Sequence, residues 1–158
     1  MKPENYPTNK NQTVVIFGPA GSGKTTLGKK LSQKYNLPLL SLDEIVWQKK
    51  YTVKYNLVIS EQLLTKFLQQ NPTGWIIEGA EPALLKLAIP RADQTIWLQH
   101  NFFTLVRRLT KRYFQNRKRK EETLSALLKL YIGVILYRTK RGLYPLHSYL
   151  AGRDKLIS

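Results

Sequence analysis

The chain has 158 residues, of which 42% are hydrophobic and 23% charged; this is enough for one globular domain and argues against general disorder. It contains no cysteine, which excludes disulfide scaffolds, thiolate metal sites and cysteine nucleophiles. The net charge of +16 is concentrated after residue 100, where 14 basic and 3 acidic residues give +11, and such a field favours anionic partners without choosing among nucleotides, nucleic acid and acidic lipid.

Short apolar or β-branched runs alternate with helical patterns along the chain. Residues 1–12 are polar and predict a flexible lead-in, followed by one domain over 13–158. The runs that predict strands are 13–17, 38–42, 75–78, 95–98 and, at the end, 155–157. The segments that predict helices are 24–35, 43–47, 60–70 with Ser60 as N-cap, 81–89, 101–116, 121–137 and 143–150, whereas 48–59 fits no pattern. This alternation predicts a parallel sheet covered by helices on both faces.

The longest mostly apolar run, 124–137, is interrupted by Lys129. It is shorter than the roughly 20 residues that a membrane span needs, so it predicts a buried helix. The polar N-terminus has no apolar stretch of the kind found in a secretory signal. We therefore expect a cytoplasmic protein with no membrane partner.

Residues 18–25 read GPAGSGKT and fit the phosphate-loop pattern G-x-x-x-x-G-K-[ST], between a predicted strand and a predicted helix. Glycines allow main-chain N–H groups to converge on phosphate oxygens, and the N-terminus of the following helix adds partial positive charge. We expect Lys24 to reach the β- and γ-phosphates of ATP and Thr25 to ligate Mg²⁺. A plain strand–helix turn would have no use for these two side chains together. The predicted nucleotide-binding residues are Gly18, Pro19, Ala20, Gly21, Ser22, Gly23, Lys24, Thr25 and Thr26.

Two carboxylates follow predicted strands, at the edge where ligands bind in open α/β sheets. Asp43 is predicted to be catalytic, by accepting a proton from an acceptor hydroxyl or by holding that hydroxyl; the alternative is a helix N-cap, with Glu44 as a first-turn charge. Glu78 stands before Gly79, where a Walker B acid would orient magnesium. We predict Thr25 and Glu78 as metal ligands, and the alternative for Glu78 is a solvated loop carboxylate.

The basic helix supplies the remaining catalytic candidates. Arg108 and Arg112 lie four residues apart, a spacing at which like charges repel unless an anion lies between them. Their planar guanidinium groups suit phosphate, although most basic residues here also fit a solvated cationic face. Weaker candidates are Arg117, Arg119, Arg138 and Arg141 for phosphate and Trp47, Tyr51 and Tyr55 for an acceptor pocket, where a core role is the alternative; His100 is expected to be a surface or capping residue.

Several segments together resemble a known family. The phosphate loop, the L-D-x-x-x-W element at 42–47, the W-I-I-E-G element at 75–79 and the arginine-rich helix resemble the adenylate-kinase-related P-loop proteins labelled DNA topology modulation protein. The resemblance covers about residues 13–158. It implies an α/β P-loop NTPase fold, a nucleoside-monophosphate-kinase-like three-layer sandwich with a five-stranded parallel sheet and a helical basic lid at about 101–122.

The resemblance also implies ATP as the phosphoryl donor. It assigns the strand-end acid to Asp43, the Walker B-like acid to Glu78 and the lid arginines to Arg108 and Arg112. The context of Asp43 is also similar to that in shikimate and gluconate kinases, which phosphorylate a hydroxyl. This chain departs from the family in having Glu at position 78 where Asp is usual, Ala-Glu at 80–81 where Asn-Tyr is frequent, and Gln-His at 99–100 where an acid is common.

Two main functions follow from these features, and a third alternative is a degenerate nucleotide-binding or interaction domain. The first is a small kinase that transfers the γ-phosphoryl group of ATP-Mg to an unidentified small acceptor, through a hydroxyl or a nucleotide. The second is a nucleic-acid-associated protein whose basic C-terminal third, with its net +11, holds DNA or RNA while nucleotide binding regulates it. A monomer is expected in either case.

Overall fold

A computed structural model describes residues 11–49, 53–117, 128–132, 135 and 156–157. The body of the sheet consists of four parallel strands in the order β2 (Leu39–Ser41), β5 (Trp75–Gly79), β1 (Thr13–Phe17) and β6 (Gln94–Trp97). The two-residue β7 (Leu156–Ile157) lies parallel to β6. An α/β fold with a parallel sheet, as the alternation predicts, is therefore confirmed, and the strand expected at 155–157 is described over Leu156–Ile157.

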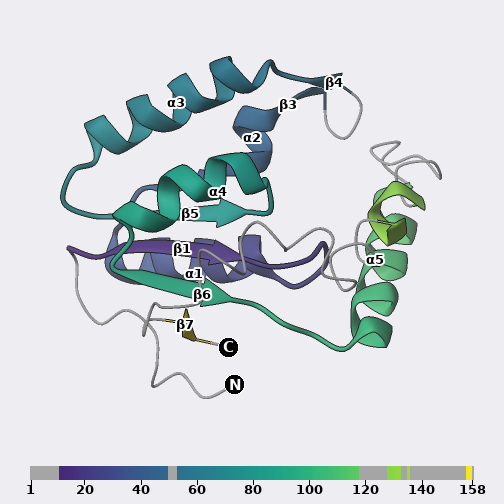
Figure 1. The fold of residues 1–158 in the computed structure, drawn as a ribbon. Helices are drawn as coiled ribbons and strands as arrows, with labels where there is room; N and C mark the ends of the chain where they lie inside the picture. The colour runs from purple at the N-terminus through teal and green to yellow at the C-terminus, as the bar shows by residue number, and fades with distance from the viewer. Residues whose placement is uncertain (1–10, 50–52, 118–127, 133–134, 136–155, 158) are drawn as a thin grey trace.

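Helices cover both faces of this sheet (Figure 1). On one face α1 (Lys24–Tyr35) packs through Leu31 against Val14 and Ile16 of β1. On the other face α2 (Leu42–Val46), α3 (Leu57–Gln70) and α4 (Pro82–Ala88) pack on a core that includes Val15 and Phe17. Consecutive β1 residues thus enter opposite cores, which explains why this strand is apolar from Val14 to Phe17.

The start of one predicted helix differs from the structure by three residues. Helix α3 begins at Leu57, not Ser60, because the side chain of Asn56 caps it by accepting a hydrogen bond from the main-chain N–H of Val58. Ser60 lies inside the helix, where its hydroxyl donates to the carbonyl of Ile45 in α2 at 2.8 Å. Ser60 therefore connects two helices and does not start one.

The segment 48–59, for which no pattern was clear, contains a short antiparallel hairpin. Its strands are β3 (Trp47–Lys49) and β4 (Val53–Lys54), and the main-chain N–H of Tyr55 donates to the carbonyl of Val46. The helix predicted at 81–89 ends at Ala88 and continues as a 3-10 turn, η2 (Ile89–Arg91). The helix predicted at 143–150, most of the one predicted at 121–137 and the lead-in up to residue 10 lie outside the described residues.

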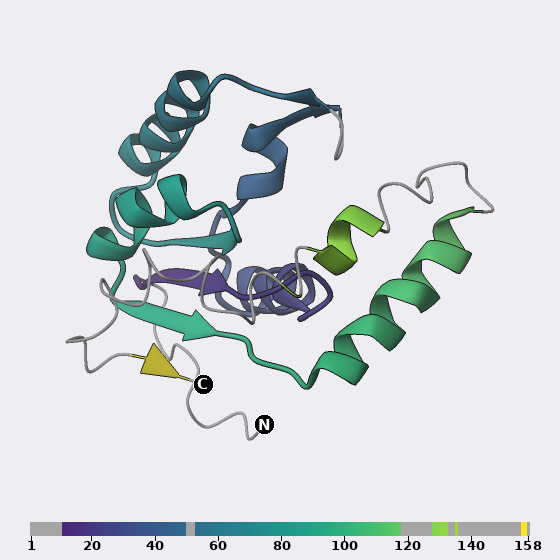
Figure 2. The ribbon, with the colours of Figure 1, turned by 45° about the vertical axis from the view of Figure 1, so that its right-hand side comes forward.

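The basic helix α5 (Phe102–Arg117) follows the carboxyl end of β6 and stands beside the sheet (Figure 2). Its side chains Leu105, Leu109 and Tyr113 pack against Ala20 of the phosphate loop. The carboxyl ends of β1, β2, β5 and β6 all point toward this side of the molecule, so the loops that follow them surround one region. Within the described part of the chain, no helix has the length and apolar character of a membrane span.

Candidate active site

The phosphate loop joins β1 to α1, as its sequence predicts. Gly18, Gly21 and Gly23 all have positive φ angles. At Gly21, with φ 78°, a side chain would also meet the Leu109 side chain of α5 at 3.2 Å, so this glycine lets the loop lie directly against the basic helix. Inside the loop, the Lys24 ammonium donates to the Pro19 carbonyl at 3.0 Å, which places its charge over the main chain of the loop.

Two side chains from the β6–α5 segment bind the loop from outside. A ring nitrogen of His100, Nε2, lies 2.9 Å from the Ser22 carbonyl oxygen, and the Arg108 guanidinium donates to the Gly21 carbonyl at 3.5 Å. Because C=O and N–H of a trans peptide point in opposite directions, holding the Ser22 carbonyl from outside directs the N–H of Gly23 inward. His100 is half-buried and binds the phosphate loop, a contact that the sequence alone did not predict.

Ser22 contributes a further polar group to the loop. Its side chain is buried, with 2% of the residue exposed, and its hydroxyl has no hydrogen-bond partner among the described residues. A buried hydroxyl without a partner costs free energy unless something binds it. A phosphate oxygen is one acceptor that would satisfy it in a loop of this kind.

Glu78 is buried at the end of β5, with 2% of the residue exposed, so the alternative of a solvated loop carboxylate is wrong. One oxygen, Oε1, accepts hydrogen bonds from the hydroxyls of Thr25 at 3.1 Å and Ser41 at 2.6 Å. The carboxylate thus connects the phosphate loop, β5 and the end of β2. Sequence reasoning missed Ser41, whose only signal is its position at a strand end beside the predicted Asp43.

Asp43 lies in the first turn of α2 and is exposed. Ser41, not Asp43, occupies the N-cap position, so the N-cap alternative for Asp43 is wrong. The position of α2 depends on Gly79, because a Cβ there would lie 2.5 Å from Cβ of the fully buried Leu42. The glycine after Glu78 therefore lets α2, with Asp43 on it, approach the end of β5.

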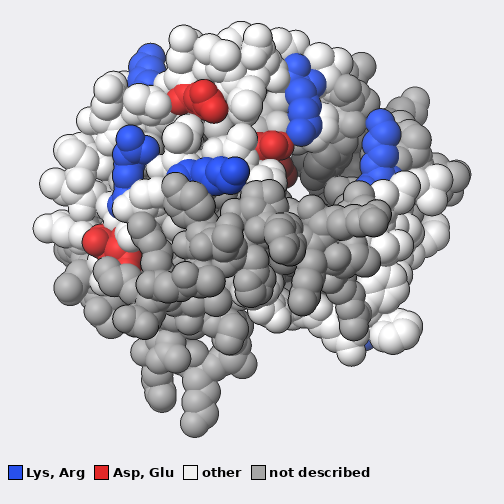
Figure 3. Space-filling view, viewed as in Figure 1, with Lys and Arg blue, Asp and Glu red and all other residues white. Residues whose placement is uncertain are grey.

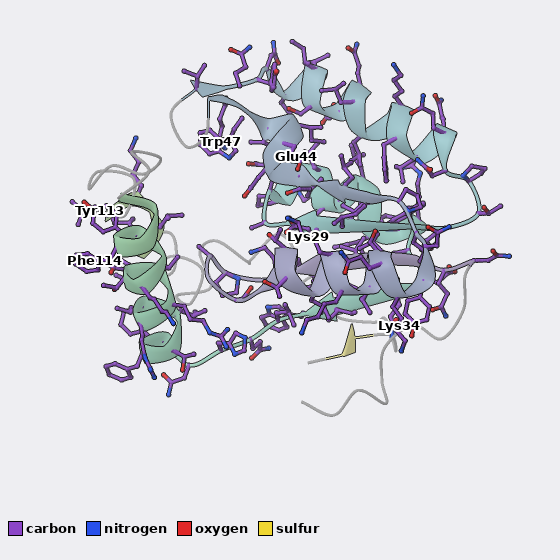
Figure 4. The ribbon with its side chains drawn as sticks, turned by 180° about the vertical axis from the view of Figure 1, so that it is seen from behind. Lys29, Lys34, Glu44, Trp47, Tyr113 and Phe114 are labelled. Atoms are coloured by element: carbon purple, nitrogen blue, oxygen red, sulfur yellow. The ribbon has the colours of Figure 1, made fainter. Side chains whose placement is uncertain are left out.

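Trp47 follows α2 in extended conformation, and its main-chain N–H donates to the carbonyl of Asp43. The Lys54 ammonium lies 5.1 Å from the centroid of the Trp47 ring and forms an ion pair with Glu81 at 3.0 Å. In Figure 4, Trp47 lies below β3 on the side toward α5. Tyr55 is half-buried, and Tyr51 lies outside the described residues.

Figure 3 shows basic and acidic side chains around a hollow in the surface, between the β3–β4 hairpin and α5. Of the predicted lid arginines, Arg108 reaches the phosphate loop. Arg112 follows one turn later on α5, but its side chain lies outside the described residues, as do the side chain of Arg117 and the whole of Arg119, Arg138 and Arg141. Thr26 is exposed on the first turn of α1.

The donors at this site suit a hard cation. Thr25 and Glu78 supply a hydroxyl and a carboxylate that already lie within hydrogen-bond distance of each other. Magnesium in nucleotide sites takes one or two protein oxygens and completes its shell with phosphates and water. No cluster of three or more histidine or carboxylate side chains occurs among the described residues, so an all-protein metal cage is not found there.

The chain is similar to known proteins in sequence and in fold. No family model matches the chain. Proteins described as "putative adenylate kinase" from Saccharolobus islandicus (strain Y.G.57.14 / Yellowstone #1) and Saccharolobus solfataricus (strain ATCC 35092 / DSM 1617 / JCM 11322 / P2) are each 29% identical over 122 residues, 73% of this chain. The chain spans 63% of the length of these relatives.

A solved structure of a gluconokinase from Sinorhizobium meliloti 1021 superposes with a TM-score of 0.50 at 11% identity, covering 92% of this chain and all of that one. At this identity the likeness concerns the fold alone. The chain therefore has an α/β fold similar to that of a P-loop kinase and a distant sequence similarity to proteins named as adenylate kinases.

Proposed function

We propose that the chain is an ATP-dependent phosphotransferase that acts on a small acceptor. The observation that carries this proposal is the hydrogen bond of 3.1 Å between the Thr25 hydroxyl of the phosphate loop and the buried Glu78 carboxylate. A structural turn needs no contact between a loop hydroxyl and a buried acid on the neighbouring strand. A nucleotide site needs both groups at one place, because together they bind the cation that accompanies the phosphates.

The proposed role of the phosphate loop is to hold the polyphosphate of ATP. Inward main-chain N–H groups and the N-terminus of α1 attract the phosphate oxygens, and the Lys24 ammonium would exchange its bond to Pro19 for the β- and γ-phosphates. Thr25 and Glu78 would hold magnesium, which supplies charge neutralisation on the transferring group. Arg108 and, by the family resemblance, Arg112 would add positive charge from α5.

Asp43 is the proposed acceptor-side residue. Its carboxylate is exposed on the turn that follows β2, two residues after Ser41, which binds Glu78. From there it would orient an acceptor hydroxyl or accept its proton as the phosphoryl group is transferred. The names of the similar proteins suggest adenylate and gluconate as the first acceptors to test.

An acceptor screen tests this function. Purified protein is incubated with ATP, Mg²⁺ and single candidate acceptors, and ADP release is measured for the unmodified chain, Lys24→Ala and the control Lys29→Ala, an exposed lysine on the same helix. We expect acceptor-dependent ADP release that Lys24→Ala abolishes and Lys29→Ala retains. Acceptor-dependent release that survives Lys24→Ala would refute the assigned chemistry.

A nucleic-acid-associated role stays a prediction of the charge distribution. The contacts described at the phosphate loop do not support a nucleic-acid role. Exposed side chains on α5 do bear on this role.

A further inference from the structure

Helix α5 has an outer face that the phosphate loop does not use. Phe103, Arg107, Lys111 and Phe114 are spaced by four, four and three residues, so they form one stripe along the helix. All four are exposed, and the two rings are unusually so, with 77% of Phe103 and 59% of Phe114 accessible to solvent. We call these four residues the α5 outer face.

The other sides of α5 are already occupied. Leu105, Leu109 and Tyr113 pack against the phosphate loop, and Arg108 reaches the Gly21 carbonyl. Figure 4 shows Phe114 pointing away from the sheet. Within the part of the chain that the structure describes, the outer face therefore does not hold α5 on the domain, and burial does not account for its two phenylalanines.

Each exposed ring contacts a neighbouring aromatic side chain. Phe103 makes an edge-to-face contact with Phe102, with ring centroids 5.9 Å apart and an interplanar angle of 75°. Phe114 makes a similar contact with Tyr113, at 5.6 Å and 68°. Such a contact favours one orientation of each ring while leaving most of its surface open to a flat partner.

We propose that the α5 outer face binds single-stranded nucleic acid. Eleven residues of helix separate the two rings by about 16 Å, and Arg107 and Lys111 stand between them as cations for the backbone phosphates. Aromatic rings that stack bases, combined with cations along the strand, are how proteins bind single strands without sequence preference. The net +11 after residue 100 adds long-range attraction.

Two other anionic partners fit this face less well. A duplex keeps its base faces stacked inside, so it would use the two cations and leave the two rings without a role. A membrane surface is bound by a helix with a continuous apolar face, whereas here two cations separate the rings and the apolar side of α5 is buried against the phosphate loop. Two cations between two exposed rings therefore favour the single strand.

Fluorescence anisotropy with a labelled twelve-nucleotide oligo(dT) tests the proposal, with the matching duplex and phosphatidylserine vesicles as competitors. We expect Phe103→Ala and Phe114→Ala each to weaken binding about 5- to 150-fold. Arg107→Ala and Lys111→Ala should each lower the slope of log affinity against log salt by about 0.7. The control Leu63→Ala/Lys66→Ala, at exposed positions of α3, should bind as the unmodified chain does.

The phosphate loop offers a second anion site, so the experiment is repeated with Lys24→Ala. Undiminished oligonucleotide binding by this variant supports the α5 outer face as the site, whatever the outcome of the kinase assay. Three results would overturn the proposal: no binding of the oligonucleotide, binding that both Phe→Ala variants retain, or stronger competition by the duplex or the vesicles. Because all four side chains are exposed, thermal unfolding of the variants should match that of the unmodified chain.

Discussion

The hydrogen bond from Ser41 to Glu78 offers a test of the site that does not depend on catalysis. The Ser41 hydroxyl oxygen lies 2.6 Å from Oε1 of Glu78, and only 2% of Glu78 is exposed. A hydrogen bond to a charged group contributes about 1.5–3 kcal/mol to stability, against about 0.5–1.5 kcal/mol for a neutral pair. We therefore expect Ser41→Ala to lower the free energy of unfolding by about 1.5–3 kcal/mol.

In a domain of this size such a loss corresponds to a decrease in Tm of roughly 3–12 °C. In the Glu78→Gln variant, Ser41→Ala should lower the free energy of unfolding by only about 0.5–1.5 kcal/mol, because the acceptor is then neutral. Urea unfolding followed by circular dichroism measures both costs. If Ser41→Ala lowered the free energy of unfolding equally with Glu and with Gln at position 78, the hydrogen bond from Ser41 to a charged Glu78 would be refuted.

Ser32→Ala is the matched control for the combination of Ser41→Ala with Glu78→Gln. The Ser32 hydroxyl donates at 2.6 Å as well, but to the main-chain carbonyl of Leu37 at the end of α1. It should cost about 0.5–1.5 kcal/mol, whether residue 78 is Glu or Gln. A dependence of this cost on residue 78 would show that Glu78→Gln disturbs more than its own hydrogen bonds.

Three further predictions concern the surroundings of the site. Gly79→Ala should destabilise the fold by about 1–3 kcal/mol in urea unfolding, because its Cβ would lie 2.5 Å from Cβ of the buried Leu42; an unchanged midpoint would contradict this packing. His100→Leu should weaken nucleotide affinity in calorimetry by leaving the Ser22 carbonyl without its donor, and His100→Gln should restore part of it; equal affinities of the two variants would argue against a positioning role. Asp43→Asn should lower turnover about 10²- to 10⁴-fold in the ADP-release assay with ATP affinity unchanged, and full turnover would remove Asp43 from the chemistry.

Local patterns predicted the framework of this fold well. The phosphate loop and the helix 24–35 lie where the sequence places them, since glycine spacing and a β-branched run are local signals. The start of α3 was predicted wrongly because Asn56 and Ser60 are both good caps, and the choice depends on tertiary contacts. The Ser60 hydroxyl donates to the carbonyl of Ile45, and the sequence around Ser60 does not indicate this distant partner.

In the candidate site as well, residues that belong to local motifs could be predicted and residues that depend on tertiary contacts could not. Lys24, Thr25 and Glu78 belong to motifs, so their types and spacing identify them. Ser41 and His100 act through contacts across 37 and 78 residues of sequence, which only the folded chain reveals. Single serines and histidines occur at many surface positions, so neither carried a signal of its own.

The central claim is that the loop between β1 and α1 binds the polyphosphate of a nucleotide with the help of the Lys24 ammonium. Isothermal titration of ATP with Mg²⁺ into the unmodified chain, Lys24→Ala and Lys29→Ala tests it most directly. We expect saturable binding that Lys24→Ala weakens at least tenfold and Lys29→Ala leaves unchanged. Equal affinity of all three proteins, or no heat of binding at millimolar ATP, would contradict the claim.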